Sequence, residues 1–202
     1  MASLLYVGHA TTLIEIDRVR LLTDPLLRRH VGHLKRLVPF GDPLPPPDAV
    51  LLSHLHADHL DFPSLRRLGQ SVPLLVPRGA GWLLRRQGFR NIVQLATGDS
   101  TSVGGVAIQA VPALHDGRRY PVGRQIAANG YTVTGSRSLY FAGDTDVFEA
   151  MAELAGADAA LLPVSGWGAT VGPGHLDPAR AAETLRLLRP GLAIPIHVPK
   201  VL

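Results

Sequence analysis

Short apolar runs that stop at a polar residue recur along this chain. The strings AVLLSH, AIQAVPALH, SLYFAGD and LAIPIH each end at a histidine or an aspartate, and these residues are His54, His115, Asp144 and His197. An apolar run of this kind, bounded by polar or turn residues, is typical of a buried β-strand. The pattern therefore predicts strands whose carboxyl ends present polar side chains.

Helices are predicted between these strands. Asp61 ahead of Pro63, and Asp177 ahead of Pro178, are helix-start signals, because aspartate caps free backbone N–H groups and proline suits the first turn. The segments that follow have apolar residues at helical spacing. We expect helices at about residues 63–69, 79–88, 146–155 and 177–189.

The two halves of the chain contain similar sequence strings in the same order. VRLLTDP and SLYFAGDT are similar, and they are followed by the similar strands DAVLLSH and DAALLPVS. Each half reads strand, strand, strand, helix, and two such halves facing each other would bury two sheets between outer helices. We therefore predict an α/β fold, a four-layer αββα sandwich of two similar halves, with the polar strand ends in the cleft between them.

The string SHLHADHLD holds four residues of the types that bind metal ions, His54, His56, Asp58 and His59. Imidazoles and carboxylates suit zinc, manganese or iron and suit calcium poorly. Strand alternation would place His54 and His56 on one side, where they can hold one ion, while Asp58 and His59 follow at the turn. The alternative is a solvated polar turn, which the dense histidines after an apolar strand disfavour.

His115, Asp144 and His197 have weaker signals when each is taken alone. A single histidine is more often a core or surface residue than a ligand, and a single aspartate is often a turn residue. Their shared place at the end of an apolar run favours ligands. With the four residues of the cluster they make seven potential ligands, which is enough for a two-metal hydrolytic centre.

The ordered strings HLHADH, His115, AGDT and PIHV resemble the ligand set of the metallo-β-lactamase fold superfamily, and the resemblance covers nearly the whole chain. It implies that His54, His56 and His115 hold one ion, that Asp58, His59 and His197 hold the other, and that Asp144 bridges them. The β-lactamases of this superfamily carry cysteine or serine at the bridging place. Aspartate there resembles the glyoxalase II, ribonuclease Z and lactonase branches, so antibiotic hydrolysis is not expected.

Further strings resemble one group within this superfamily. GHATTLIEI with His9, LLTDP with Asp24, LSHLHADHLD, and GHLDP with His175 are similar to the ascorbate-6-phosphate lactonase-like and N-acylphosphatidylethanolamine phospholipase D-like proteins. The resemblance places His175 on the substrate side of the metals. These strings surround the metal ligands and therefore do not identify the substrate.

Catalytic roles follow for two residues. Asp58 would orient the nucleophile or accept its proton while binding metal, and His175 would protonate the leaving group or bind the substrate oxyanion. The alternative for His175 is a plain polar residue at a helix start. Asp24 is either a turn residue or an acceptor that fixes a ligand imidazole.

Substrate contacts are predicted from position. His9 lies in the GHAT string, Trp167 lies in a glycine-rich loop that leads to His175, and Arg118 and Arg119 follow His115. Lysine and arginine total 20 against 16 acidic residues, a net charge of +4. This excess is expected either to cover solvated helix faces or to attract an anionic small-molecule substrate. Nucleic acid is not expected, because aromatic residues make up 5% and no basic patch is concentrated.

Composition excludes several other chemistries. The chain has no cysteine, so a disulfide framework, a thiolate metal site and a cysteine nucleophile are excluded. It also has no GxSxG string for a serine nucleophile. The sequence MASLLYVGHA lacks the features of a signal peptide, and no apolar stretch approaches the roughly 18 residues of a transmembrane helix. A cytoplasmic location is expected.

One domain over residues 1–202 is expected, because this length and a hydrophobic content of 46% suit a single packed core. The sequence ends five residues after His197. The resembled relatives usually continue into a closing helix, so this early end is expected to leave either a shortened final layer or a truncated sequence that lacks that helix. Such an absence leaves open a homo-oligomer that covers the exposed apolar surface.

The sequence thus predicts a hydrolase that uses a metal-bound hydroxide to cleave a small ester, lactone or phosphodiester. Two divalent ions are expected, zinc first, with manganese or iron also suited. Two alternatives remain open. One is a mononuclear iron dioxygenase-type oxidoreductase on the same fold, and the other is a catalytically inactive metal-binding domain.

Overall fold

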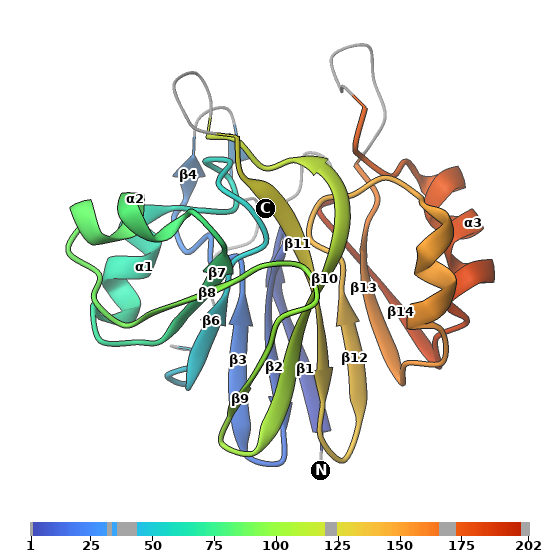
Figure 1. Cartoon of the computed structure of the whole chain (residues 1–202), viewed down its shortest axis with the longest axis horizontal. Helices are drawn as coiled ribbons and strands as arrows, with labels where there is room; N and C mark the ends of the chain where they lie inside the picture. Colours follow the sequence, from blue (N-terminus) through green and yellow to red (C-terminus); the bar gives the residue numbers. More distant parts are fainter. Residues whose placement is uncertain (1, 32–33, 36–43, 120–124, 166–172, 199–202) are drawn as a thin grey trace.

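Two six-stranded sheets face each other in the computed structural model, which describes residues 2–31, 34–35, 44–119, 125–165 and 173–198 (Figure 1). The first sheet has the order β1-β2-β3-β6-β7-β8 and the second β14-β13-β12-β11-β10-β9, while β4 and β5 form a small separate pair. The strands are β1 Ala2–Gly8, β2 Thr11–Ile16, β3 Val19–Thr23, β4 His30–Val31, β5 Leu34–Lys35, β6 Ala49–Leu51, β7 Leu74–Pro77, β8 Ile92–Leu95, β9 Ser100–Val103, β10 Val106–Asp116, β11 Ala127–Thr134, β12 Ser138–Phe141, β13 Ala159–Pro163 and β14 Leu192–Ile196.

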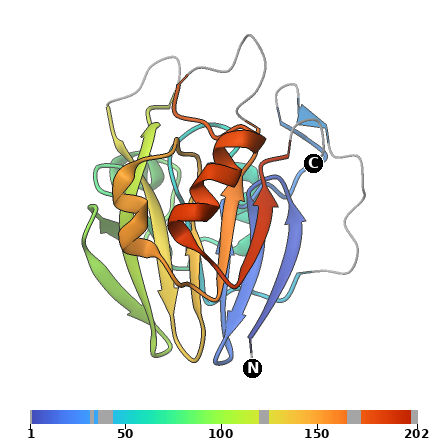
Figure 2. The same ribbon diagram turned by 90° about the vertical axis from the view of Figure 1, so that its right-hand side faces the viewer.

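Helices cover the outer face of each sheet (Figures 1 and 2). α1 Phe62–Leu68 and α2 Gly81–Arg86 lie against the first sheet, and the 3₁₀ helix η1 Glu149–Leu154 and α3 Pro178–Leu188 lie against the second. The layers confirm the predicted αββα sandwich. The predicted caps are also present, since Asp61 accepts a hydrogen bond from the Ser64 N–H and Asp177 accepts one from the Arg180 N–H.

Two helices are shorter than predicted. α2 is flanked by Gly79 and Gly88, whose φ angles of 96° and 90° lie in the left-handed region that interrupts an α-helix. The predicted helix at 146–155 is a 3₁₀ helix that begins only at Glu149, since Phe148 before it has the backbone angles of an extended strand. Apolar periodicity predicts which segments form helices over the sheets, but it does not predict where the backbone leaves helical geometry.

Three apolar clusters hold the layers together. The largest lies between the sheets and includes Ile14, Leu21, Ile108, Tyr131 and Phe141, all of them buried. A second cluster packs under α1 and α2, and a third packs under η1 and α3. Burial of this apolar surface is the main stabilising contribution and fixes the two sheets relative to each other.

The predicted echo between the halves is visible in the topology. β3 pairs in parallel with β6, and β12 pairs in parallel with β13. Asp24 follows β3, and Asp144 follows β12. The backbone N–H of Asp24 donates to the Leu51 carbonyl of β6, and that of Ala142 donates to the Leu161 carbonyl of β13, the neighbouring parallel strand in each sheet. The two aspartates therefore occupy corresponding ends of the two sheets.

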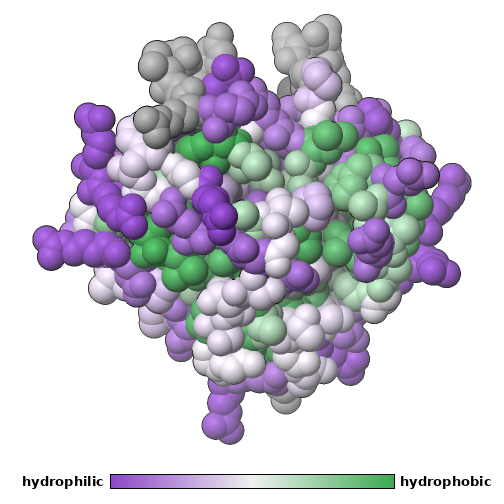
Figure 3. Space-filling model, viewed as in Figure 1, coloured by the Kyte–Doolittle hydropathy of each residue, from purple (hydrophilic) through white to green (hydrophobic). Residues whose placement is uncertain are grey.

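The surface is polar at its rim. In the view of Figure 3, hydrophilic side chains project around the edge of the molecule. Several exposed arginines form ion pairs, such as Arg78 with Asp99 and Arg137 with Asp158. Within the described ranges, none of the helices has the length and apolar character needed to cross a membrane.

Candidate metal centre

His54, His56 and His115, the first ligand group, lie together at the ends of β6 and β10. The ring centroids of His54 are 4.5 Å from those of both His56 and His115. His56 Nδ1 lies 3.2 Å from His115 Nε2, and one ring nitrogen of each residue fits within a 4.8 Å cluster. β6 ends at Leu51, so a loop brings His54 and His56 together, and the strand alternation predicted for them is wrong.

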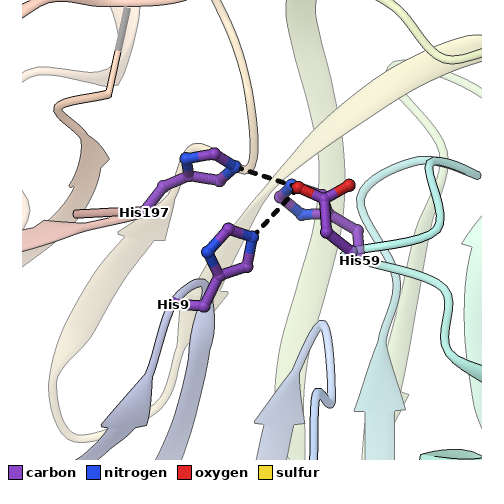
Figure 4. A group of neighbouring side chains, drawn as sticks. His9, His59 and His197 are labelled. Atoms are coloured by element: carbon purple, nitrogen blue, oxygen red, sulfur yellow. Dashed lines mark hydrogen bonds and ion pairs between the residues drawn. The ribbon is translucent and has the colours of Figure 1, made fainter. Parts of the chain in front are cut away.

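Asp58, His59 and His197, the second ligand group, lie beside the first. Asp58 Oδ2 is 3.4 Å from His197 Nε2 and 3.7 Å from His59 Nε2. His9 joins this group, and Figure 4 shows the rings of His9, His59 and His197 converging from different segments. The distances from Asp58 Oδ2 to the two imidazole nitrogens are close to those between ligand atoms that each bind the same ion at about 2.1 Å.

Asp144 lies between the two ligand groups and is buried. Its Oδ2 is 3.3 Å from His59 Nε2 and 3.5 Å from His197 Nε2, both in the second group. It also falls within one 4.8 Å cluster with His115 of the first group and with His175. This is the position from which one carboxylate can contact ions held by both groups.

The outward Nδ1 of four ligand histidines is hydrogen-bonded. Ligand histidines in metal sites generally donate their other ring N–H to an acceptor, which fixes the ring and its tautomer. The pairs here are His54 with the Ser53 hydroxyl at 2.9 Å, His59 with the Asp24 carboxylate at 2.7 Å, His115 with the Gly174 carbonyl at 2.9 Å, and His197 with the Ser165 hydroxyl.

The inward atoms have no such partners. Nε2 of His54, His59 and His197, and Oδ1 of Asp144, are buried and make no hydrogen bond within the described part of the chain. A buried polar atom left unpaired costs about 1–3 kcal/mol. When these imidazoles are neutral with the proton on Nδ1, each Nε2 presents a lone pair to the same small region. This donor set fits divalent metal ions.

Burial keeps the first ligand group neutral. Burial lowers the pKa of His54 well below its ordinary value of 6.5, with a smaller effect from charge on His59. It likewise lowers the pKa of His56, and it lowers that of His115 to about 4. Neutral imidazole is the form that binds a metal ion, so these three residues are ready to bind without losing a proton.

In the second ligand group, attraction between carboxylates and histidines determines the pKa values. Burial acts to raise the pKa of Asp58 and of Asp144, but electrostatic attraction to neighbouring histidines, led by His59 for Asp58 and by His197 for Asp144, outweighs it and holds both pKa values well below 3.8. Burial acts to lower the pKa of His59, yet the carboxylates of Asp144 and Asp58 raise it well above 6.5. Without an ion, His59 therefore retains a proton that an ion must displace.

His175 and Asp24 both lie against the candidate ligands. His175 Nε2 is 3.6 Å from Asp144 Oδ2, its ring is 4.7 Å from that of His115, and its side chain is 22% exposed. Asp24 is fully buried and accepts hydrogen bonds from His59 and Ser53. Burial raises the pKa of Asp24, and the hydrogen bonds from His59 and Ser53 oppose that shift. Its side chain thus faces the ligands instead of serving a simple turn.

The residues predicted to bind substrate are placed differently from one another. His9 is 2% exposed, and its Nε2 lies 3.1 Å from Asp58 Oδ2. Arg118 pairs with its neighbour Asp116 at 3.0 Å. Arg119 donates to the carbonyls of Leu55 and Leu60, which bracket the loop of ligands, and lies over the Phe62 ring. Trp167 lies outside the described residues.

Three contacting residues carried no sequence signal. Ser53, Ser165 and Gly174 supply the acceptors for three ligand imidazoles. A serine beside a histidine is common in any loop, and a backbone carbonyl has no residue type. Such acceptors are found only when the fold brings distant segments together.

Comparison with known proteins shows the family of this chain. Residues 19–198 match the family model described as a beta-lactamase superfamily domain. A UPF0173 metal-dependent hydrolase of Opitutus terrae is 36% identical over 208 residues, which cover 96% of this chain and 83% of that protein. N-acyl-phosphatidylethanolamine-hydrolyzing phospholipase D 1 of Caenorhabditis elegans is 29% identical, over 95% of this chain and 62% of that protein.

A solved structure matches as well. Igni18, a metallo hydrolase from the archaeon Ignicoccus hospitalis, aligns with a TM-score of 0.74 and 25% identity, covering 98% of this chain and 83% of that one. The matches include the phospholipase D-like group that the strings around the ligands resemble. They therefore confirm the resemblance that those strings carry.

Proposed function

Because the chain belongs to the metallo-β-lactamase superfamily, we propose that it is a hydrolase that depends on two divalent metal ions. His54, His56 and His115 would hold one ion, and Asp58, His59 and His197 the other. Asp144 would contact both. Zinc suits this set of nitrogen and oxygen ligands, and manganese and iron are also suited.

One observation carries the proposal. The buried Nε2 atoms of His54, His59 and His197 have no hydrogen-bond partner in the described chain, while the Nδ1 atom of each is held by a hydrogen bond. A core histidine that served packing alone would satisfy its inward nitrogen, because an unpaired buried acceptor is unfavourable. Three such nitrogens around a buried carboxylate support cation binding and argue against an inactive polar cluster.

Two bound ions would supply an acidified water and would polarise a carbonyl or phosphoryl group. The side chains around them then move protons and hold the substrate. Asp58 is 29% exposed at its side chain, so it reaches the open side of the site and is placed to orient the attacking water or accept its proton. His9 donates to Asp58 from behind and fixes the direction of that carboxylate.

His175 would act on the leaving group. It precedes the Asp177 cap of α3, and its side chain is partly exposed beside Asp144 and His115. A histidine there can donate a proton to a departing oxygen or hold a substrate oxyanion. Hydrolysis of an ester, a lactone or a phosphodiester needs one group that accepts a proton from the attacking water and one that donates a proton to the leaving group. Asp58 would be the acceptor and His175 the donor.

The test is an activity screen of the zinc- or manganese-reconstituted protein over lactones, thioesters, phosphodiesters and phospholipids. We expect turnover of one class, lost in His115→Ala and retained in His30→Ala. His30 is an exposed histidine distant in sequence from the ligands, so its variant controls for the loss of any imidazole. Full binding of zinc with no turnover of any class would contradict the hydrolase proposal, and oxygen consumption with iron would favour an oxidoreductase.

A further inference from the structure

Asp24 is a fully buried carboxylate that accepts three hydrogen bonds. Its Oδ1 accepts from the backbone N–H of Ser53 at 2.8 Å. Its Oδ2 accepts from the Ser53 hydroxyl at 2.5 Å and from His59 Nδ1 at 2.7 Å. Three donors around one carboxylate stabilise its ionised form in a buried place. Asp24 therefore holds both Ser53 and His59 in fixed orientations.

Through its hydroxyl, Ser53 also fixes the orientation of a third residue, His54. A hydroxyl has one proton, and Ser53 gives it to Asp24, so its oxygen must accept from the next group. That group is Nδ1 of His54, 2.9 Å away. His54 is thereby held as the tautomer with the proton on Nδ1, which leaves the Nε2 lone pair directed into the first ligand group.

Ser53 has little room to turn away. Gly143 precedes Asp144 with a φ of 61°, and a Cβ built on it would lie 2.4 Å from the Ser53 Cβ. The Ser53 carbonyl accepts from the Asn129 N–H at 2.9 Å. The serine is thus fixed by the second sheet and by the segment that carries Asp144.

We propose that Ser53 relays the orienting effect of Asp24 to His54, so that one carboxylate orients a histidine of each ligand group and couples ion binding at the two groups. Asp24 acts on His59 directly and on His54 through the serine. The inference rests on the proposed two-ion centre. Ser53 and Asp24 are positioning residues here, since neither faces the substrate side.

The chain provides a matched control for the serine. Ser165 also contacts the Nδ1 of a ligand histidine, His197, and no contact with Asp24 is described for it. Ser165→Ala therefore removes the same type of hydrogen bond from a single ligand. Ser53→Ala removes a hydrogen bond that is joined to Asp24.

The test measures zinc affinity with Asp24→Asn introduced into three backgrounds, the wild type, Ser53→Ala and Ser165→Ala. A competing chelator gives the dissociation constants, and anomalous diffraction at the zinc edge assigns occupancy to each ligand group. In the wild-type and Ser165→Ala backgrounds, Asp24→Asn should weaken zinc at the first ligand group by about 10- to 100-fold. In the Ser53→Ala background the same substitution should change it by less than about threefold.

An equal loss at the first ligand group in all three backgrounds would overturn the relay. Asn has the shape of Asp, and Ala removes one oxygen, so circular dichroism of the zinc-free variants should match the wild type. A wild-type protein that binds one zinc ion would overturn the proposed function as well. If the wild type binds two ions but the effects of Asp24→Asn and Ser53→Ala on zinc affinity are additive, the relay alone would be overturned.

Discussion

The backbone N–H of His197 donates to the backbone carbonyl of His9 at 2.9 Å. His9 lies between β1 and β2 of the first sheet, and His197 follows β14 of the second. Their φ angles, 56° and 51°, are both in the left-handed region, which non-glycine residues enter rarely. One hydrogen bond between two strained residues thus joins the sheets beside Asp58.

The His9 side chain should matter for activity through Asp58. His9→Asn should fold like the wild type, because asparagine tolerates the left-handed backbone. Its shorter side chain cannot reproduce the contact with Asp58, so kcat/KM should fall by about 10- to 100-fold. Steady-state kinetics and thermal unfolding on the same preparations check this. Wild-type kcat/KM in His9→Asn would show that the Asp58 contact has no catalytic consequence.

His175 should affect turnover and not metal content. His175→Ala should retain its ions and lose about 100-fold or more in kcat, the usual scale for loss of a general acid or base. Substrates with good leaving groups should lose less, since they need no proton. Elemental analysis and kinetics over a leaving-group series measure both effects. A uniform wild-type rate would mean that His175 is a helix-start residue alone.

Arg119 should stabilise the fold more than Arg118. Arg119→Met removes two charge-assisted hydrogen bonds to the loop carbonyls of Leu55 and Leu60 and should lower the free energy of unfolding by about 2 kcal/mol. Arg118→Met should change it by less than about 0.5 kcal/mol, because its ion pair with Asp116 is exposed. Chemical denaturation measures both. Unchanged stability with a raised KM for anionic substrates would instead favour the substrate-binding role predicted from the sequence.

Ion binding should release a proton from His59. Its pKa is raised above 6.5 by Asp144 and Asp58, so the ion-free protein binds this proton at pH 7. The burial that lowers the pKa values of His54 and His115 has already removed theirs. Zinc affinity should therefore rise with pH until the pKa of His59 is passed. Calorimetry in buffers of different ionisation enthalpy should report about one proton released, and zero release at pH 7 would contradict this account.

The parts of the fold that depend on local residue patterns could be predicted from the sequence. The apolar strands that precede His54 and Asp144, and the strand that carries His115, were readable because burial selects residue type directly. The caps Asp61 and Asp177 were readable because a helix start needs a side-chain acceptor. The late start of η1 at Glu149 was not readable, since it depends on the extended backbone of Phe148.

The contacts around the ligands could not be predicted in the same way. Ser53, Ser165 and the Gly174 carbonyl act through geometry that arises only when the two sheets meet. Arg119 follows a ligand in sequence, and so it suggested a substrate contact, yet its guanidinium turns back to the loop that carries His56 and Asp58. Sequence position gives the neighbourhood of a long side chain but not its direction.

The central claim is a two-ion centre bridged by Asp144, and the most direct test is elemental analysis of the zinc-saturated protein and its Asp144→Ala variant. We expect two ions per wild-type chain, because seven ligand-type residues converge with Asp144 between the two groups. Asp144→Ala should lose occupancy of both positions at limiting zinc. Saturation of the wild type at one ion per chain, or loss of a single ion in Asp144→Ala, would contradict the bridged centre.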